Sequence, residues 1–373
     1  MEYSQRHLEL NTQFQMGTDT HLDISNVDIR CFSFHSIPQT VYEERLLPVS
    51  TDARINENNS FQYPVFMPAG SKRADKAILL LHGLNERNWS KYLSWAEYLC
   101  KKTRKPVILF PIAFHVNRSP LSWTNPRDLK YLLDLRRQRN GEDRSLSFAN
   151  VTFSERISEQ PDRFYNSGRQ SLNDLSHLFT NIKNGSHPLF TENTQIDIFA
   201  YSIGAFLAEI TMMTNPNGLF TDSKLFMLCG GGIFSSMHGE SRFIMDKSAY
   251  EKLFNYYQYN FVNETKDDYL RDKAFESFNS MISVERNQTE RVSFFNRLGN
   301  KLKGISLTHD KVMPYYGVTE ALGESCATNR ISLLDFPFDY SHENPFPVGK
   351  LINSTEVDRA FSYVFEEAVE FLA

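Results

Sequence analysis

From about residue 60 onward, short apolar runs alternate with longer segments whose apolar side chains repeat at helical spacing. The run that ends at Leu81 is apolar throughout, as expected for a strand covered on both faces. This alternation predicts an α/β fold, in which helices flank a mostly parallel central sheet. Strands are expected at residues 62–67, 76–81, 107–110, 195–199, 224–229, 303–307 and 331–334, and the main helices at 88–103, 169–182, 205–210 and 356–372.

Three segments depart from this rhythm. Residues 1–60 are polar and weakly patterned, apart from an alternating stretch at 27–34, so we expect an N-terminal extension that can add edge strands. Residues 61–373 are expected to form one domain, with insertions at about 114–162 and 233–299 that make a helical cap. The arginines at 136–144 of the first insertion are typical of a solvated face, with an anionic substrate site as the alternative. The aromatic cluster at 254–259 of the second fits either cap packing or the wall of an acyl pocket.

The pentapeptide Ala200–Gly204 lies between the predicted strand at 195–199 and the predicted helix at 205–210. Small residues two positions before and two after Ser202 allow a strand and a helix to pack closely around a strained turn. Such a nucleophile elbow pushes the serine hydroxyl out of the sheet, where a base and a substrate can reach it. Ser202 is therefore the candidate nucleophile.

A serine hydroxyl needs a general base, and the base needs a group that orients it. Asp310 follows the predicted strand at 303–307, and His342 follows the strand at 331–334. Functional groups collect at this end of parallel strands, and the order serine, acid, histidine is that of the elbow arrangement. For Asp310 the alternative is a helix N-cap, and for His342 an ordinary loop histidine. His309 and Asp339 are weaker candidates for base and acid because each stands too near its proposed partner in sequence.

Acyl transfer also needs N–H donors for the developing oxyanion. One is expected from Ile203, directly after the serine, and the other from Leu84, with Gly83 permitting close approach. Tyr201, directly before the serine, is included among the candidate oxyanion or binding residues.

These residues carry a resemblance to the α/β-hydrolase superfamily, through His82-Gly83, Ala200–Gly204, Asp310 and His342. It covers about residues 60–373, with the two insertions less well matched. It departs from the usual pattern in having alanine at the first small position of the elbow. The overall pattern also resembles a bacterial branch of that superfamily, which supplies no substrate. The resemblance implies a serine hydrolase with Ser202 as nucleophile, His342 as base and Asp310 as orienting acid. A serine at the elbow argues against members that carry aspartate there.

Composition narrows the function further. A net charge of −5 gives no reason to expect nucleic acid. The N-terminus does not resemble a signal peptide, the apolar runs are too short to span a membrane, and the four cysteines show no metal-like spacing. We expect a cytoplasmic enzyme without metal or cofactor that cleaves a small-molecule carboxylic ester or related acyl compound. Acyl transfer, thioester or peptide cleavage on the same residues, and a non-catalytic binding protein, remain alternatives. The sequence does not indicate an oligomeric state.

Overall fold

The structure, a computed structural model, describes residues 2–37, 51–264 and 271–373. These residues form a nine-stranded sheet in the order β1-β2-β3-β5-β4-β6-β7-β8-β9. The six strands from β4 to β9 run parallel, and β1 to β3 add an antiparallel edge. The predicted fold class is therefore confirmed. The strands are β1 (Thr20–Leu22), β2 (Val27–His35), β3 (Ser60–Pro68), β4 (Ala74–Leu81), β5 (Val107–Leu109), β6 (Phe190–Tyr201), β7 (Leu225–Leu228), β8 (Leu302–Leu307) and β9 (Ile331–Leu334).

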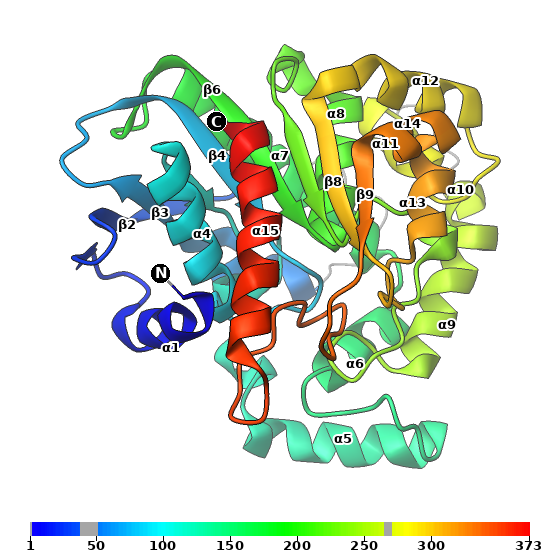
Figure 1. The fold of residues 1–373 in the computed structure, drawn as a ribbon. Helices are drawn as coiled ribbons and strands as arrows, with labels where there is room; N and C mark the ends of the chain where they lie inside the picture. Colours follow the sequence, from blue (N-terminus) through cyan, green and yellow to red (C-terminus); the bar gives the residue numbers. More distant parts are fainter. Residues whose placement is uncertain (1, 38–50, 265–270) are drawn as a thin grey trace.

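Both faces of the sheet are covered (Figure 1). On β4, Leu79 and Leu81 join the cluster formed with α7 (Arg163–Lys183) and α8 (Ile203–Thr214). Ile78 and Leu80 face the opposite cluster, formed with α1 (Tyr3–Gln13), α4 (Ser90–Thr103) and α15 (Ser354–Leu372). Because successive strand side chains point to opposite faces, an uninterrupted apolar run fits a strand between two helical layers.

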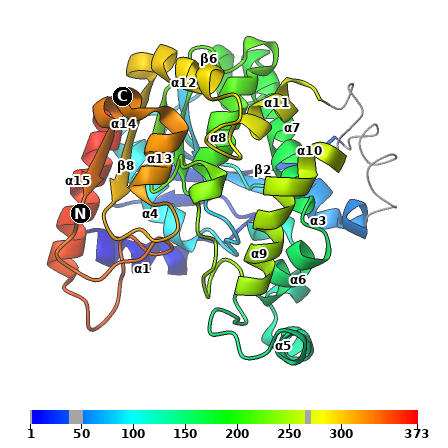
Figure 2. The same ribbon diagram turned by 90° about the vertical axis from the view of Figure 1, so that its right-hand side faces the viewer.

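Most of the remaining helices lie either beyond the carboxyl ends of the strands or on the side of α8 (Figures 1 and 2). They are α3 (Asn56–Asn59), α5 (Pro126–Asn140), α6 (Val151–Glu159), α9 (Lys247–Asn255), α10 (Phe261–Glu264), α11 (Lys273–Ser280), α12 (Gln288–Leu298), α13 (Tyr315–Leu322) and α14 (Glu324–Arg330). No helix in the described ranges is both long and apolar enough to cross a bilayer. Residues 38–50 of the expected N-terminal extension and 265–270 of the second expected insertion lie outside the described residues.

The expectation of a solvated arginine face at 136–144 is wrong for Arg136. Its guanidinium is buried and forms a paired contact with Asp246, at 2.7 Å from each carboxylate oxygen, and a third contact with Glu155 at 2.6 Å. Asp246 also caps α9 by accepting from the Ala249 N–H. Arg136 therefore joins α5 to the start of α9, and a charge that looks solvated in sequence is neutralised by residues far along the chain.

The aromatic cluster at 254–259 belongs mainly to packing. Tyr257 is fully buried and contacts the rings of Phe164, Phe234 and Phe278. Its hydroxyl accepts from the Tyr165 N–H and donates to the Pro161 carbonyl. Tyr259, by contrast, is 69% exposed.

Candidate active site

Ser202 lies on a sharp turn between β6 and α8, with φ 56° and ψ −126°. A side chain at positive φ is strained, and the surroundings leave little room to relax it. A Cβ on Gly204 would stand 2.7 Å from the His82 carbonyl oxygen. One on Gly230, in the loop after β7, would stand 2.7 Å from the Ser202 carbonyl oxygen. The absence of side chains at these two positions allows the strand, the turn and the helix to pack together as the sequence predicts.

The structure brings Ser202, His342 and Asp310 into one hydrogen-bonded chain. Ser202 Oγ lies 2.6 Å from His342 Nε2, and His342 Nδ1 lies 2.7 Å from Asp310 Oδ2. The three residues are 3%, 4% and 4% exposed, so water competes little for these hydrogen bonds. Because a carboxylate only accepts, Nδ1 carries a proton, and Nε2 is then free to accept the serine proton.

Backbone donors fix Asp310 from the other side. Its Oδ1 accepts from the N–H groups of Val312 and Met313 at 2.9 and 2.8 Å. These bonds close a turn and do not cap a helix, because α13 begins at Tyr315 with Pro314 as its N-cap. The two other acid–base candidates point to solvent, since the side chain of His309 is 66% exposed and Asp339 is exposed.

Tyr201 supports His342 through its ring and its hydroxyl. Its ring stacks on the His342 ring with centroids 5.7 Å apart, and its hydroxyl donates to the His342 carbonyl. Burial raises the pKa of Tyr201 well above its ordinary value, so the hydroxyl keeps the proton it donates. The side chain of Tyr201 thus positions the histidine loop.

The loop after β4 brings the backbone N–H groups of Gly83 and Leu84 close to Ser202. The Gly83 N–H is already taken by the Tyr92 hydroxyl at 2.9 Å, and Tyr92 in turn donates to Glu86. Within the described part of the chain, the N–H groups of Leu84 and Ile203 have no such acceptor. Ile203 is the first residue of α8, where the helix dipole favours negative charge.

His82 holds this loop in place through two hydrogen bonds. Its Nε2 accepts from the Ile112 N–H at 2.9 Å, and its Nδ1 donates to the Gly83 carbonyl at 2.8 Å. Burial lowers the pKa of His82 to about 4, so the ring is neutral at physiological pH.

Leu84 lines three hollows in the surface of the described residues. The first contains Ser202 and His342 and is bordered by Lys91, Phe243 and Glu343. A second, almost wholly apolar hollow contains Ile203 and holds about 560 Å³ of space, open solvent included. The apolar part of its wall includes residues of α7, α8 and α11, namely Leu172, Phe206, Leu207, Ile210, Ala274 and Phe278.

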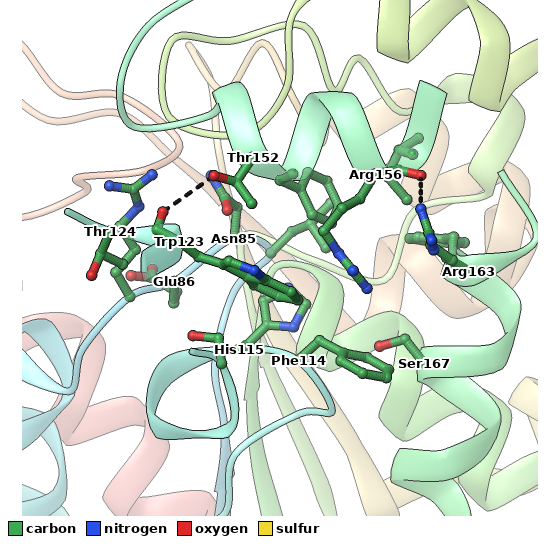
Figure 3. A pocket seen from close by; sticks show the side chains of 16 residues that line it. Asn85, Glu86, Phe114, His115, Trp123, Thr124, Thr152, Arg156, Arg163 and Ser167 are labelled. Carbon is green, nitrogen blue, oxygen red and sulfur yellow. Dashed lines mark hydrogen bonds between the residues drawn. The ribbon is translucent and has the colours of Figure 1, made fainter. Parts of the chain in front are cut away.

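The third hollow is more polar (Figure 3). Thr152 and Arg156 of α6 and Trp123 border it, and it shares His115 and Ser167 with the apolar hollow. Arg156 stacks on Trp123 at 4.1 Å and forms a paired contact with Asp52, so its charge is compensated.

Several of these residues carry no sequence signal that would single them out. Tyr92 belongs to a helical aromatic pattern that reads as core, and His115 stands in a segment without a motif. The positions of Gly204 and Gly230 could have been inferred from the elbow and from the glycine run after the predicted strand. Among the described residues, no group of three His, Cys, Asp or Glu side chains is placed to hold a metal ion.

The sheet and the turn at Ser202 define an α/β protein whose candidate site lies at the carboxyl ends of β4, β6, β8 and β9. The chain belongs to a family described as a family of unknown function, DUF6051, whose model matches residues 1–373. No curated protein matches the chain by sequence.

Several solved structures have a similar course of the chain. A thermostable esterase from Pseudomonas putida is 11% identical, with a TM-score of 0.48 over 100% of this chain and 91% of its own. A cold-adapted esterase from an Arctic intertidal metagenomic library is 11% identical, with a TM-score of 0.43 over 96% and 98%. A protein assigned as a dipeptidyl aminopeptidase IV from Bacteroides ovatus is 11% identical, with a TM-score of 0.46 over 91% of this chain and 35% of its own.

Proposed function

We propose that the protein is a serine hydrolase that cleaves a carboxylic ester or related acyl compound through an acyl-enzyme on Ser202. The observation that carries this proposal is the pair of buried hydrogen bonds that links Ser202 to His342 and His342 to Asp310. Ser202 itself lies on a strained turn. Strain of this kind persists only where the surrounding structure enforces it, and it is concentrated at functional sites. A protein that only binds a ligand has no need of a serine, a base and an orienting acid in this geometry.

In the proposed acylation, Ser202 Oγ attacks the carbonyl carbon while its proton passes to His342 Nε2. Asp310 holds the imidazole in the required tautomer and stabilises the imidazolium. The N–H groups of Leu84 and Ile203 stabilise the oxyanion, each contributing on the order of 3 kcal/mol to transition-state stabilisation. When the carbon–oxygen bond to the leaving group breaks, His342 returns the proton to the leaving oxygen. Water then repeats these steps to release the acid and regenerate Ser202.

Labelling with a fluorophosphonate probe tests the nucleophile directly. We expect the wild-type protein to react and Ser202→Ala to be unlabelled, with ester turnover lowered by about 10⁴-fold or more. Ser306→Ala is the matched control, because the Ser306 hydroxyl is buried without a hydrogen-bond partner among the described residues and lies outside the site. Equal labelling of Ser202→Ala and the wild-type protein would refute the assignment. Identifying the products formed when an alcohol or an amine is added to the aqueous assay distinguishes hydrolysis from acyl transfer.

A further inference from the structure

His115 has a buried ring nitrogen without a hydrogen-bond partner beside the candidate active site. The residue is 5% exposed, and its Nδ1 lies 2.8 Å from the Ala113 carbonyl oxygen. Since a carbonyl oxygen only accepts, Nδ1 carries the proton and Nε2 is the acceptor of a neutral ring. No donor in the described part of the chain reaches Nε2. Burial lowers the pKa of His115 to about 3, so the ring stays neutral at physiological pH.

The backbone around His115 is held in a strained conformation. Phe114 and Val116 have φ angles of 65° and 50°. A β-branched residue in this region is a marked outlier, and such strain tends to accumulate at ligand-binding positions. Hydrogen bonds hold the loop in place, from the Val116 N–H to the Glu86 carbonyl and from Ser167 Oγ to the Ala113 carbonyl. The fold thus fixes both the position and the tautomer of the His115 ring.

His115 lies where the apolar and the polar hollow meet. Both hollows include His115, and both reach Leu84. Figure 3 shows His115 near the centre of the residues that line the polar hollow, with Thr152 and Arg156 on the helix above. An unpaired acceptor at this point is costly unless a bound molecule supplies a donor.

The proposed mechanism indicates which part of a substrate would reach this nitrogen. His342 must return a proton to the leaving group, so the leaving group belongs in the hollow that His342 borders. The acyl group then extends past Leu84 and Ile203, the two proposed oxyanion donors, into the hollow they share. That path leads to His115.

We propose that His115 Nε2 accepts a hydrogen bond from the acyl part of the substrate, which carries a hydroxyl or amide N–H close to its carbonyl and an otherwise apolar chain. The inference rests on the proposed function and adds a substrate class to it. The apolar chain packs against α7 and α8 residues, among them Leu172, Phe206 and Ile210. His115 acts as a specificity-determining residue and takes no part in proton transfer.

Matched p-nitrophenyl esters test this proposal. The series comprises butanoate, 2-hydroxybutanoate, 3-hydroxybutanoate and N-acetylglycinate, each assayed for kcat/KM and corrected for spontaneous hydrolysis. We expect the wild-type protein to favour at least one donor-bearing ester over butanoate by about tenfold, the contribution of one hydrogen bond made in a dry site.

Variants locate the source of that preference. His115→Phe keeps a ring of similar size without an acceptor, so the ratio of donor-bearing ester to butanoate should fall to about one. His115→Gln offers an amide oxygen as acceptor and should keep part of the ratio. His187→Gln is the control, because His187 is also buried but its Nε2 already contacts the Tyr63 hydroxyl at 2.9 Å and it borders none of the three hollows. Its ratio should equal that of the wild-type protein.

Two results would overturn the inference: a wild-type protein that prefers none of the donor-bearing esters, or a preference that survives in His115→Phe. The first needs no variant, so it decides the matter even if His115→Phe does not fold. Fluorophosphonate labelling separates this failure from failure of the proposed function. If Ser202 is labelled and butanoate is hydrolysed while the preference is missing, only the role of His115 is wrong. If Ser202 is never labelled and no ester is cleaved, the proposed function itself fails.

Discussion

The reactivity proposed for Ser202 depends on a histidine 140 positions away along the chain. The sequence could indicate this partner because each candidate follows a predicted parallel strand, and the carboxyl ends of such strands share one edge of the sheet. It could not indicate His115, whose proposed role depends on which ring nitrogen the Ala113 carbonyl engages. That information exists only once the loop has its folded geometry.

Asp310→Asn is expected to lower kcat for ester hydrolysis on the order of 10³–10⁴-fold. The amide can still accept from the Val312 and Met313 N–H groups, but it no longer favours the tautomer with a proton on His342 Nδ1. Steady-state kinetics on a p-nitrophenyl ester measure the effect, and thermal unfolding checks the fold. Asp339→Asn, at an exposed carboxylate, should behave as the wild-type protein. An Asp310→Asn variant within tenfold of wild-type kcat would contradict the role proposed for Asp310.

Helix α8 shows how one element combines the site with the core. Its N-terminal residue offers the proposed oxyanion donor, while Glu209, two turns further, is fully buried. Among the described residues, no donor reaches either carboxyl oxygen of Glu209. Burial raises its pKa well above the ordinary value of 4.5, against the opposing effect of the Arg291 charge. Burial therefore favours the protonated form of this side chain in the folded protein.

Glu209 is expected to make stability fall as pH rises. Below about pH 4.5 the carboxyl is protonated in both the folded and the unfolded chain, and its contribution is fully present. Above that pH only the unfolded chain ionises, so the free energy of unfolding decreases by about 1.4 kcal/mol per pH unit until the folded pKa is reached. Glu209→Gln should remove this slope, as measured by urea unfolding between pH 5 and 8. Glu324→Gln, at an exposed carboxyl, should keep it. Identical slopes for wild type and Glu209→Gln would show that Glu209 is ionised in the folded state.

The accuracy of the predicted bounds differs from one helix or strand to the next. Apolar strands such as β8 match the expected range almost residue for residue, whereas α7 begins at Arg163, before the expected start at 169. Helix α1 was not expected, because one of its three buried positions is Arg6, which breaks the apolar pattern. A periodicity of apolar residues cannot reveal a helix that is held in place partly by a buried charge.

At the scale of the whole molecule, buried ion pairs join segments that are distant in sequence. Arg6 of α1 forms a paired contact with Glu97 of α4, at 2.8 Å from Nε to Oε2 and 2.6 Å from Nη2 to Oε1. The Arg6 and Glu97 side chains are 3% and 0% exposed. Such a pair stabilises less than its distances suggest, but removing one partner leaves a buried charge uncompensated.

Arg6→Met is expected to lower the free energy of unfolding by about 3–5 kcal/mol, measured by urea unfolding at pH 7. The double variant Arg6→Met with Glu97→Leu should recover most of that loss, because neither charge is then buried alone. Arg137→Met is the control, since its contact with Asp134 is 3.7 Å long and both side chains are more than half exposed, so its effect should be within about 0.5 kcal/mol. A loss in Arg6→Met no larger than in this control would show that the pair contributes little.

By itself, the sequence determined the layer architecture and indicated the turn at Ser202 and the two residues, His342 and Asp310, that the structure places in hydrogen-bond contact with it and with each other. Apolar runs, small residues and the order of strands are local properties, and each has few physical outcomes. Only the tertiary structure decided that Arg136 is buried, that Tyr201 supports His342 and that His115, which borders two of the hollows, has an unpaired ring nitrogen. These features depend on which polar groups meet after folding. A single sequence does not encode that choice locally, because the partners come from segments that are separate in the chain.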